Sequence, residues 1–228
     1  MRIGACLLFK NGLCYQSYRW EYFRPLGSLQ NAVEILEERQ VDEISIIRPC
    51  RKEVTPYSFE TDLEIISNLN CTTPLSFGGG LRDRASLEKL HELPIERILL
   101  SSAYLDKNER LIKDAISIFG RQALIAVFPY RVSHGKIEYF HCRTNSFVDS
   151  SLNFADKYSN EVMFYDTQHD GLNYLCNQKI PDFPIPNSKI ILSGGVNKKL
   201  LSKARKFSFA AVAFDNSFLH HEFNFSQL

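Results

Sequence analysis

The sequence lacks an excess of positive or negative residues, and it lacks a long hydrophobic run. Its 27 Lys and Arg residues balance 26 Asp and Glu residues, which leaves a formal net charge of +1. Without a basic surplus there is no general attraction to nucleic acid or anionic membranes, so we expect neither as a partner. The apolar run near the N-terminus breaks at Lys10-Asn11-Gly12, too early for a transmembrane helix, and no small-residue cleavage site follows. We therefore expect a cytoplasmic protein.

The sequence also lacks the spacings that usually hold metals. Its six cysteines form no CxxC pair, and its histidines show neither HxH nor HExxH spacing. Scattered cysteines in a reduced compartment are more often buried thiols than disulfides or ligands. We expect no metal and no cofactor. The residues concerned are Cys6, Cys14, Cys50, Cys71, Cys142 and Cys176, with His134, His141, His169, His220 and His221.

Short apolar runs alternate with amphipathic stretches along the whole chain. Such alternation is typical of βαβ units around a parallel sheet, whose strands are buried on both faces. At 228 residues the chain suits one (βα)₈ TIM barrel, for which about 250 residues is typical. We predict an α/β fold with a single barrel domain over residues 1–228. The predicted strands are ACLLF, EISIIR, PLSFG, ERILLSS, ALIAVF, EVMFYD, KIILSG and FAAVAFD.

The two halves of the chain show related patterns. FGGGLRDRASLEKL at 77–90 and LSGGVNKKLLSKA at 192–204 are both strand–glycine–helix units. ACLLFKNG at 5–12 and AVFPYRVSHG at 126–135 open the two halves in a similar way. This repetition favours an internal duplication of a half-barrel.

Glycine pairs follow two of the predicted strands, at Gly79-Gly80 and Gly194-Gly195. Glycine lets the backbone approach a phosphate closely, and in barrels of this type the active site lies at the carboxyl ends of the strands. The pattern therefore predicts two phosphate-binding loops on opposite sides of the barrel mouth. The alternative is that these glycines only form tight turns between strand and helix.

An ordered series of short motifs resembles the cyclase subunit of imidazole glycerol phosphate synthase. The series includes the N-terminal Cys6-Leu7-Leu8-Phe9-Lys10-Asn11-Gly12 segment, and the similarity extends from Arg2 to about Phe218. The other motifs are VDEI at 41–44, FGGGLRD at 77–83, SSA at 101–103, HDG at 169–171 and SGG at 193–195. The resemblance implies a (βα)₈ barrel that works with a glutaminase subunit, and phosphate contacts from Gly79, Gly80, Ser102, Gly194 and Gly195.

The catalytic positions of that family are changed in this sequence. The family uses two aspartates, on the first and fifth strands, as general acid and base, and the matching positions are Leu8 and Phe128. Neither side chain can transfer a proton, and loss of one such group usually costs about 10²–10⁴-fold in rate. Gln16 replaces a substrate-binding lysine, Arg48 replaces an aspartate, and Asp215-Asn216 replaces small residues of the eighth-strand phosphate loop. The resemblance therefore predicts a barrel without the family's cyclase chemistry.

The opposite end of the barrel keeps the family's charges. The family admits ammonia through four charged residues where the glutaminase docks, and the matching residues are Arg2, Glu43, Arg97 and Glu161. Glu96 matches a neighbouring acidic residue that helps to anchor the glutaminase. The alternative is that charged residues at the starts of barrel strands simply interact with solvent.

Three functional hypotheses follow. The first is a barrel that docks a glutaminase and conducts ammonia to a third enzyme. The precedent is a group of paralogues that also carry Cys-Leu-Leu and are encoded with surface-polysaccharide genes. These paralogues are thought to take part in the synthesis of acetamidino sugars. The second is an active cyclase of histidine biosynthesis with relocated acid and base groups at Asp166, His169 or Asp170. The third is a non-catalytic barrel that binds a phosphorylated metabolite.

Overall fold

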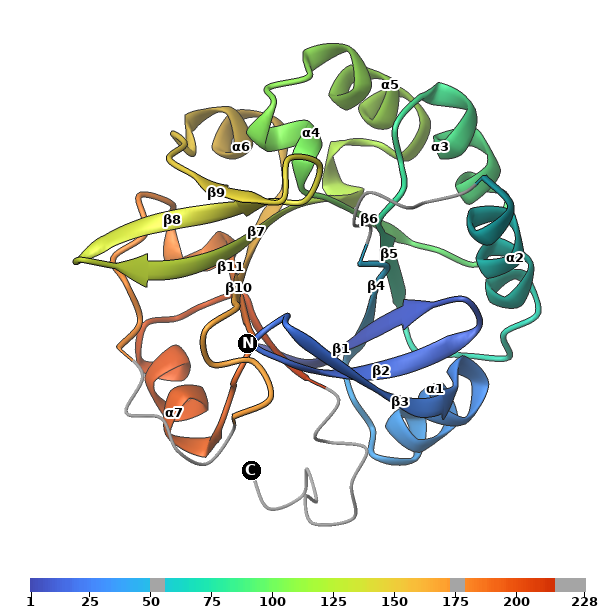
Figure 1. Cartoon of the computed structure of the whole chain (residues 1–228), viewed down its shortest axis with the longest axis horizontal. Coiled ribbons are helices and arrows are strands. Elements are labelled where there is room, and N and C mark those ends of the chain that lie inside the picture. The colour runs from blue at the N-terminus through green and yellow to red at the C-terminus, as the bar shows by residue number, and fades with distance from the viewer. Residues whose placement is uncertain (50–55, 173–178, 216–228) are drawn as a thin grey trace.

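Eight parallel strands form a closed barrel in the computed structural model, which describes residues 1–49, 56–172 and 179–215. Neighbouring strands pair in chain order around the ring, and pairing of β7 with β10 and of β12 with β1 completes it (Figure 1). All eight strands predicted from the apolar runs are present, so the predicted TIM barrel is confirmed. The barrel strands are β1 (Arg2–Lys10), β4 (Glu43–Ile47), β5 (Leu75–Gly78), β6 (Arg97–Leu100), β7 (Leu124–Ser133), β10 (Glu161–Asp166), β11 (Ile190–Ser193) and β12 (Ala211–Phe214).

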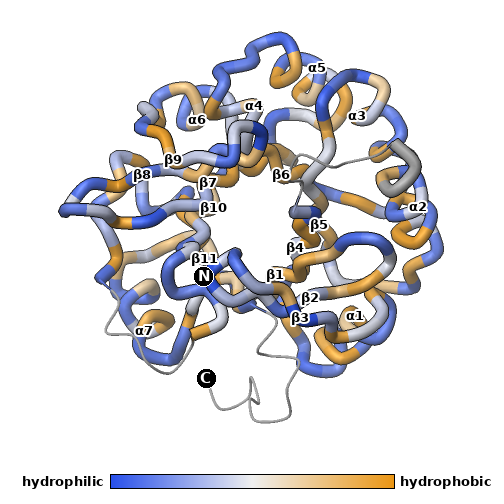
Figure 2. Tube along the Cα trace, in the orientation of Figure 1, coloured by the Kyte–Doolittle hydropathy of each residue, from blue (hydrophilic) through white to orange (hydrophobic). Residues whose placement is uncertain are grey.

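Helices surround the barrel and present their apolar sides to it (Figures 1 and 2). Polar residues begin several of them: Ser28, Asp83, Asn108 and Asn197 each accept a hydrogen bond from a backbone N–H of the first turn. Gly120, with φ of 80°, ends the most regular helix. The helices are α1 (Leu29–Glu38), α2 (Pro56–Ser67), α3 (Arg84–His91), α4 (Ser102–Leu105), α5 (Glu109–Phe119), α6 (Asn153–Tyr158) and α7 (Lys198–Lys206), with short 3₁₀ turns η1 (Arg121–Ala123) and η2 (Asn187–Lys189).

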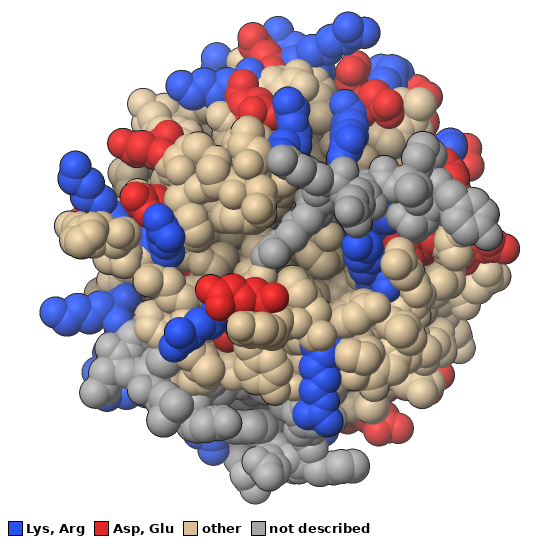
Figure 3. Space-filling view, in the orientation of Figure 1, with Lys and Arg blue, Asp and Glu red and all other residues tan. Residues whose placement is uncertain are grey.

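The molecular surface carries charges of both signs. Figure 3 shows basic and acidic side chains interspersed over the face that is seen along the barrel axis. This mixture agrees with the nearly balanced composition. None of the described helices combines the length and the apolar composition that crossing a lipid bilayer requires.

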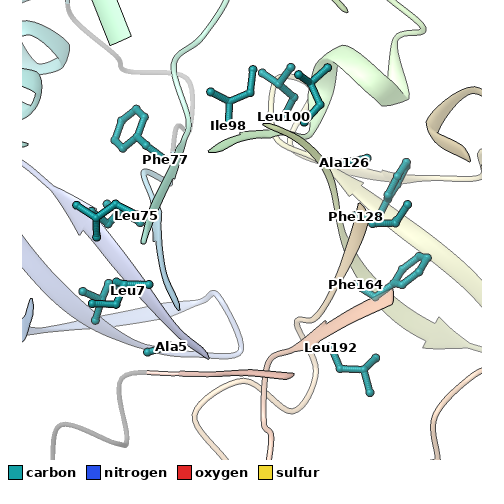
Figure 4. Packing of buried hydrophobic residues seen from close by; sticks show 14 of the residues in the cluster. Ala5, Leu7, Leu75, Phe77, Ile98, Leu100, Ala126, Phe128, Phe164 and Leu192 are labelled. Atoms are coloured by element: carbon teal, nitrogen blue, oxygen red, sulfur yellow. The ribbon is translucent and has the colours of Figure 1, made fainter. Parts of the chain in front are cut away.

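The hydrophobic core has two layers because every barrel strand is buried on both sides. The outer layer lies between strands and helices and contains Leu7, Phe77 and Phe164, whose side chains point away from the barrel axis (Figure 4). The inner layer fills the barrel and contains Cys6, Leu8, Leu99 and Met163, together with Ile47, Ile125, Val127, Tyr165, Ile191, Ala211 and Ala213.

Two antiparallel hairpins extend the first strand of each half-barrel, and the sequence patterns did not predict them. β2 (Leu13–Tyr18) pairs with β1 and with β3 (Tyr22–Ser28), while β8 (Lys136–His141) pairs with β7 and with β9 (Ser146–Val148). The connecting turns Asn11-Gly12 and His134-Gly135 all have positive φ, as two-residue hairpin turns require. The equivalent placement of the two hairpins matches the repeat seen between the two halves of the sequence.

Candidate functional site

Four charged side chains meet at the amino-terminal ends of the barrel strands. Arg2 donates from Nε to Glu43 Oε2 at 2.8 Å and from Nη2 to Glu161 Oε1 at 2.7 Å. Arg97 donates to Glu161 Oε2 at 2.6 Å and also contacts Glu43 Oε2. The four residues, hereafter the charge ring, therefore alternate in sign around the barrel axis, with each glutamate contacting both arginines.

The charge ring is largely shielded from water. The side chains of Glu43 and Glu161 are 4% and 9% exposed, whereas those of Arg97 and Arg2 are 19% and 38% exposed. Burial lowers the pKa of Arg2, but its contacts with Glu161 and Glu43 outweigh burial and raise that pKa overall. Glu96 lies beside Arg97 and is exposed, so it adds a negative charge to the outer surface of this face.

The aromatic side chain of Trp20 covers the opposite end of the barrel. It lies in the turn between β2 and β3, belongs to the inner core layer and is 7% exposed. Its ring packs against Phe140 of β8 at 5.9 Å and Tyr165 of β10 at 5.1 Å, measured between ring centroids. Arg19 and Trp20 both have positive φ, and Arg19 N–H donates to the Asp170 carbonyl. Trp20 lines two pockets and therefore separates them.

The structure places the two substituted catalytic positions differently. Leu8 is buried in the inner layer, facing the barrel interior. Phe128 belongs to the outer layer, where it packs against Phe164 and Tyr139, and Figure 4 shows it pointing away from the axis. Phe128 therefore does not face the mouth, although the resemblance matches it to a catalytic position. The flanking residues Val127 and Pro129 line the mouth pocket instead, and neither can transfer a proton.

One pocket at the mouth is lined by arginines and small residues. Its lining includes Gly79, Gly80 and Ser102, which were predicted to contact phosphate, and it encloses about 90 Å³. Arg48, Arg82 and Arg143 bring positive charge to it, together with Ser101. We call this the arginine pocket. Arg48 is buried, donates to Asp62 at 2.6 Å and lies over the Phe59 ring, so its position is rigidly set.

The other side of the mouth is acidic. Asp170 is buried and accepts a hydrogen bond from Tyr165 Oη at 2.6 Å. Burial, followed by the nearby charge of Asp215, raises the pKa of Asp170 to about 8, although hydrogen bonds from Ser17 and Tyr165 act in the opposite direction. This carboxyl group is therefore mostly protonated at neutral pH.

His169 and Asp166 form a hydrogen-bonded pair on the same side of the mouth. His169 Nδ1 lies 2.8 Å from Asp166 Oδ2, and this hydrogen bond raises the pKa of the imidazole despite partial burial. Asp166 Oδ1 also accepts the backbone N–H groups of Gln168 and His169. The pair lies beside a larger open pocket of about 680 Å³ that contains His169, Arg131 and Phe147. Of the three acid–base candidates in the second hypothesis, Asp166 and His169 are thus in contact, whereas Asp170 is bonded to Tyr165.

The glycines of the two loops are required by close packing. A Cβ at Gly79 would lie 2.1 Å from the Arg48 carbonyl oxygen, and one at Gly194 would lie 2.3 Å from that of Asp166. At Gly195 it would lie 2.4 Å from the His169 carbonyl oxygen. Close packing in these turns therefore requires glycine whether or not a ligand binds there.

The mutation Gly79→Ala should lower the free energy of unfolding by about 3 kcal/mol or more, because its Cβ overlaps a backbone oxygen. Gly135→Ala is the matched control: Gly135 also has positive φ, but nothing lies within 4 Å of its Cβ position, so only about 1–2 kcal/mol should be lost. Urea unfolding measures both. Equal losses of stability would show that glycine is required at position 79 because of backbone strain and not because of packing.

No cluster of three or more His, Cys, Asp or Glu side chains suited to a metal ion occurs within residues 1–49, 56–172 and 179–215. His220, His221 and Asn216 lie outside the described residues, as do Cys50 and Cys176. His141 is buried and bonded to Asp106, which indicates a structural role. Gln16 is buried within β2.

Comparison with known proteins identifies the family. The family model described as "Histidine biosynthesis protein" matches residues 2–224. The chain belongs to this family. The match covers nearly the whole barrel, so both the charge ring and the mouth lie on the family's common fold.

Members of the histidine biosynthesis family with related sequences have several names. A Campylobacter jejuni protein, provisionally named imidazole glycerol phosphate synthase subunit hisF2, is 31% identical over 54% of this chain and 49% of its own length. Imidazole glycerol phosphate synthase subunit HisF of Hydrogenobaculum is 25% identical over 87% of this chain and 81% of its own length. An imidazole-4-carboxamide isomerase of Clostridium novyi is 22% identical over 75% of this chain and 72% of its own length. The name of its substrate contains two phosphoribosyl groups. For the first relatives, the match spans only about half of their length.

Sequence reasoning missed two sets of contacts in this family member: the packing of Trp20 in the mouth and the pairing of Asp166 with His169. Trp20 lies between two predicted elements of the sequence, and nothing in its neighbours indicates burial in the mouth. The Asp166–His169 pair has i,i+3 spacing at a strand end, a signal that could have been read as an ion pair. Both features depend on loop conformations that local sequence patterns do not specify.

Proposed function

We propose that this protein is the barrel subunit of a glutamine amidotransferase system. It docks a glutaminase at the face that carries the charge ring and Glu96, and it conducts ammonia through the barrel to another enzyme. That enzyme uses the ammonia, for example to amidinate a sugar in surface-polysaccharide biosynthesis. The observation that carries the proposal is the charge ring, in which two arginines and two glutamates from four different strands converge on the barrel axis.

The interior of the barrel suits passage of an uncharged molecule. Behind the charge ring, Cys6, Leu99 and Met163 are apolar, and the buried hydroxyl groups of Ser45 and Ser76 bond to each other. Such a lining disfavours ammonium strongly, because burial of an unpaired ion is costly, whereas neutral ammonia carries no such penalty. The charge ring and Trp20 stand at the two ends of this interior, so each must shift for ammonia to pass.

The inward-facing residues at the mouth support a barrel without the family's acid–base pair. Leu8, Val127 and Pro129 offer no titratable group there. The relatives are named as subunits, which agrees with a protein that works in a complex. The rival proposal is an active cyclase that uses Asp170 or His169. Normal turnover of the family's phosphoribosyl substrate with an ammonium salt would favour that rival and contradict ours.

The decisive experiment measures glutamate released from glutamine by the glutaminase encoded nearest to this protein, with and without the barrel. We expect the barrel to stimulate release at least tenfold. Glu96→Arg should weaken this stimulation without loss of stability, because Glu96 is exposed and outside the charge ring. Glu88→Arg, on the exposed surface of α3, is the control and should leave stimulation unchanged. Absence of both binding and stimulation would contradict the proposal.

A second function is supported by the arginine pocket. Gly79, Gly80 and Ser102 lie beside Arg48, Arg82 and Arg143, and this combination of small residues and guanidinium groups suits a phosphate. We propose that the mouth binds a phosphorylated small molecule there. This binding concerns the end of the barrel opposite the charge ring, so it can be tested without the glutaminase.

A further inference from the structure

We propose that the barrel mouth accepts a ligand with a single phosphate group, because the carboxylate of Asp215 takes the place that a second phosphate would need. This inference rests on the proposed binding of phosphate at the arginine pocket. It adds the chemical class of the ligand: one phosphate at one end, and an uncharged or cationic group, such as hydroxyls or an amine, at the other.

The two sides of the mouth carry different ionisable groups, arginines on one side and aspartates on the other. The arginine pocket collects three guanidinium groups around Gly79 and Gly80. The position of a Cβ on Gly80 would be 3.3 Å from Arg48 Nη1, so a buried cation lies directly over that loop. Across the mouth, the loop after β10 and the end of β12 contribute Asp166, Asp170 and Asp215, all buried.

Asp215 already accepts a backbone N–H group of the loop after β10, as a bound anion would. It directly follows β12, is 7% exposed, and accepts the backbone N–H of Gly171 at 3.2 Å through Oδ2. Gly171 has φ of 75°, and a side chain there would overlap the Ser17 carbonyl oxygen. Its N–H group is thus bonded to a carboxylate that belongs to the protein.

The glycines on this side are also covered. The Asp166 carbonyl oxygen lies against Gly194 and that of His169 lies against Gly195, so both glycines are held in place by the backbone of the loop after β10. A phosphate placed here would meet the Asp215 carboxylate, and like charges repel. The acidic side therefore excludes a second phosphate but favours hydroxyl groups or an amine, which can donate hydrogen bonds to these oxygens.

Titration calorimetry on the purified full chain tests this inference with ribose 5-phosphate, ribulose 1,5-bisphosphate and ribose. We expect ribose 5-phosphate to bind, ribose to show no measurable binding, and the bisphosphate to bind no more tightly than the monophosphate. Arg82→Ala should weaken ribose 5-phosphate at least tenfold. Arg205→Ala, on the exposed surface of α7, is the matched control and should leave affinity unchanged.

Two variants of Asp215 identify the cause of the selectivity. Asp215→Asn removes the charge with little change of shape, and Asp215→Ala also removes the hydrogen bond to Gly171. We expect the affinity for the bisphosphate to rise about tenfold or more across this series, while that for ribose 5-phosphate changes less than threefold. Circular dichroism and thermal unfolding establish that both variants fold.

The possible failures are distinguishable. If the wild-type protein binds the bisphosphate tenfold more tightly than the monophosphate, or if the Asp215 variants leave the bisphosphate unchanged, the single-phosphate inference is wrong while phosphate binding stands. If neither phosphate binds, or if Arg82→Ala has no effect, phosphate binding at the arginine pocket is itself wrong, and the inference fails with it.

Discussion

Replacing Glu43 with alanine should lower the free energy of unfolding by about 3 kcal/mol, among the largest effects of any single side chain in the charge ring. Glu43 Oε2 accepts hydrogen bonds from both Arg2 and Arg97, and its side chain is 4% exposed. Without Glu43, the guanidinium groups of Arg2 and Arg97 have only Glu161 as a partner in the charge ring. Arg97 is largely buried, so water replaces the lost contact poorly. The partial exposure of Arg2 keeps the loss below that of a fully buried pair.

Urea unfolding of Glu43→Ala and Glu88→Ala provides the matched comparison. Glu88 also pairs with an arginine, Arg84, but both side chains are 54% exposed, so its loss should change the free energy of unfolding by less than about 0.5 kcal/mol. A loss at Glu43 no larger than that at Glu88 would mean that the charge ring is solvated. The alternative interpretation, in which these charges only interact with solvent, would then be favoured.

Asp170→Asn should make the stability of the protein less dependent on pH. The pKa of Asp170 is raised to about 8 in the folded protein, mainly by burial and then by Asp215, while an unfolded chain has the ordinary value near 4. Between these values the folded state binds more protons than the unfolded state, so stability falls as pH rises from about 4 to about 8. Asparagine remains uncharged throughout and its Oδ1 can still accept the hydrogen bond from Tyr165.

Thermal unfolding from pH 5 to pH 9 measures this difference. We expect wild type and Asp170→Asn to unfold at similar temperatures near pH 5 and to differ by roughly 5 °C or more near pH 9, with the variant more stable. Parallel profiles for the two proteins would show that Asp170 is ionised in the folded state at neutral pH.

His169 contributes to the same pH profile with the same sign. Its pKa is raised by Asp166, so its stabilising contribution is complete below the unfolded value near 6.5 and is lost as pH rises through the folded pKa. Asp170→Asn leaves this component in place. The variant should therefore retain a smaller decline of stability above about pH 6, which His169→Gln would remove.

The two ends of the barrel differ in how many of the resembled family's residues they keep. At the amino-terminal end, all four charged residues keep the expected sign and meet in one charge ring. At the mouth, Leu8 and the inward-facing Val127 and Pro129 carry no titratable group. Under the proposed function, the amino-terminal end would keep the contact with the glutaminase, while the chemistry would be completed by another enzyme.

Residue patterns were sufficient for the barrel and insufficient for its hairpins. Parallel strands buried on both faces need continuous apolar runs, and these runs stand out between amphipathic helices. β2 and β8 have mixed patterns, and β3 is largely exposed, so their residues lack the alternation that indicates a strand. Asn11-Gly12 ends an apolar run, and because the residues after it lack a strand-like alternation, the pair does not by itself predict a hairpin.

The sequence by itself determined the eight-stranded barrel, the glycine loops and the signs of the four charges, because each depends on residue type and local spacing. Only the tertiary structure decided which side chains meet. Arg2 and Glu161 are 159 residues apart and touch because the barrel closes between β12 and β1. The tertiary structure likewise turned Phe128 away from the axis and placed Trp20 in the mouth, since strand register and loop conformation determine which way a side chain points.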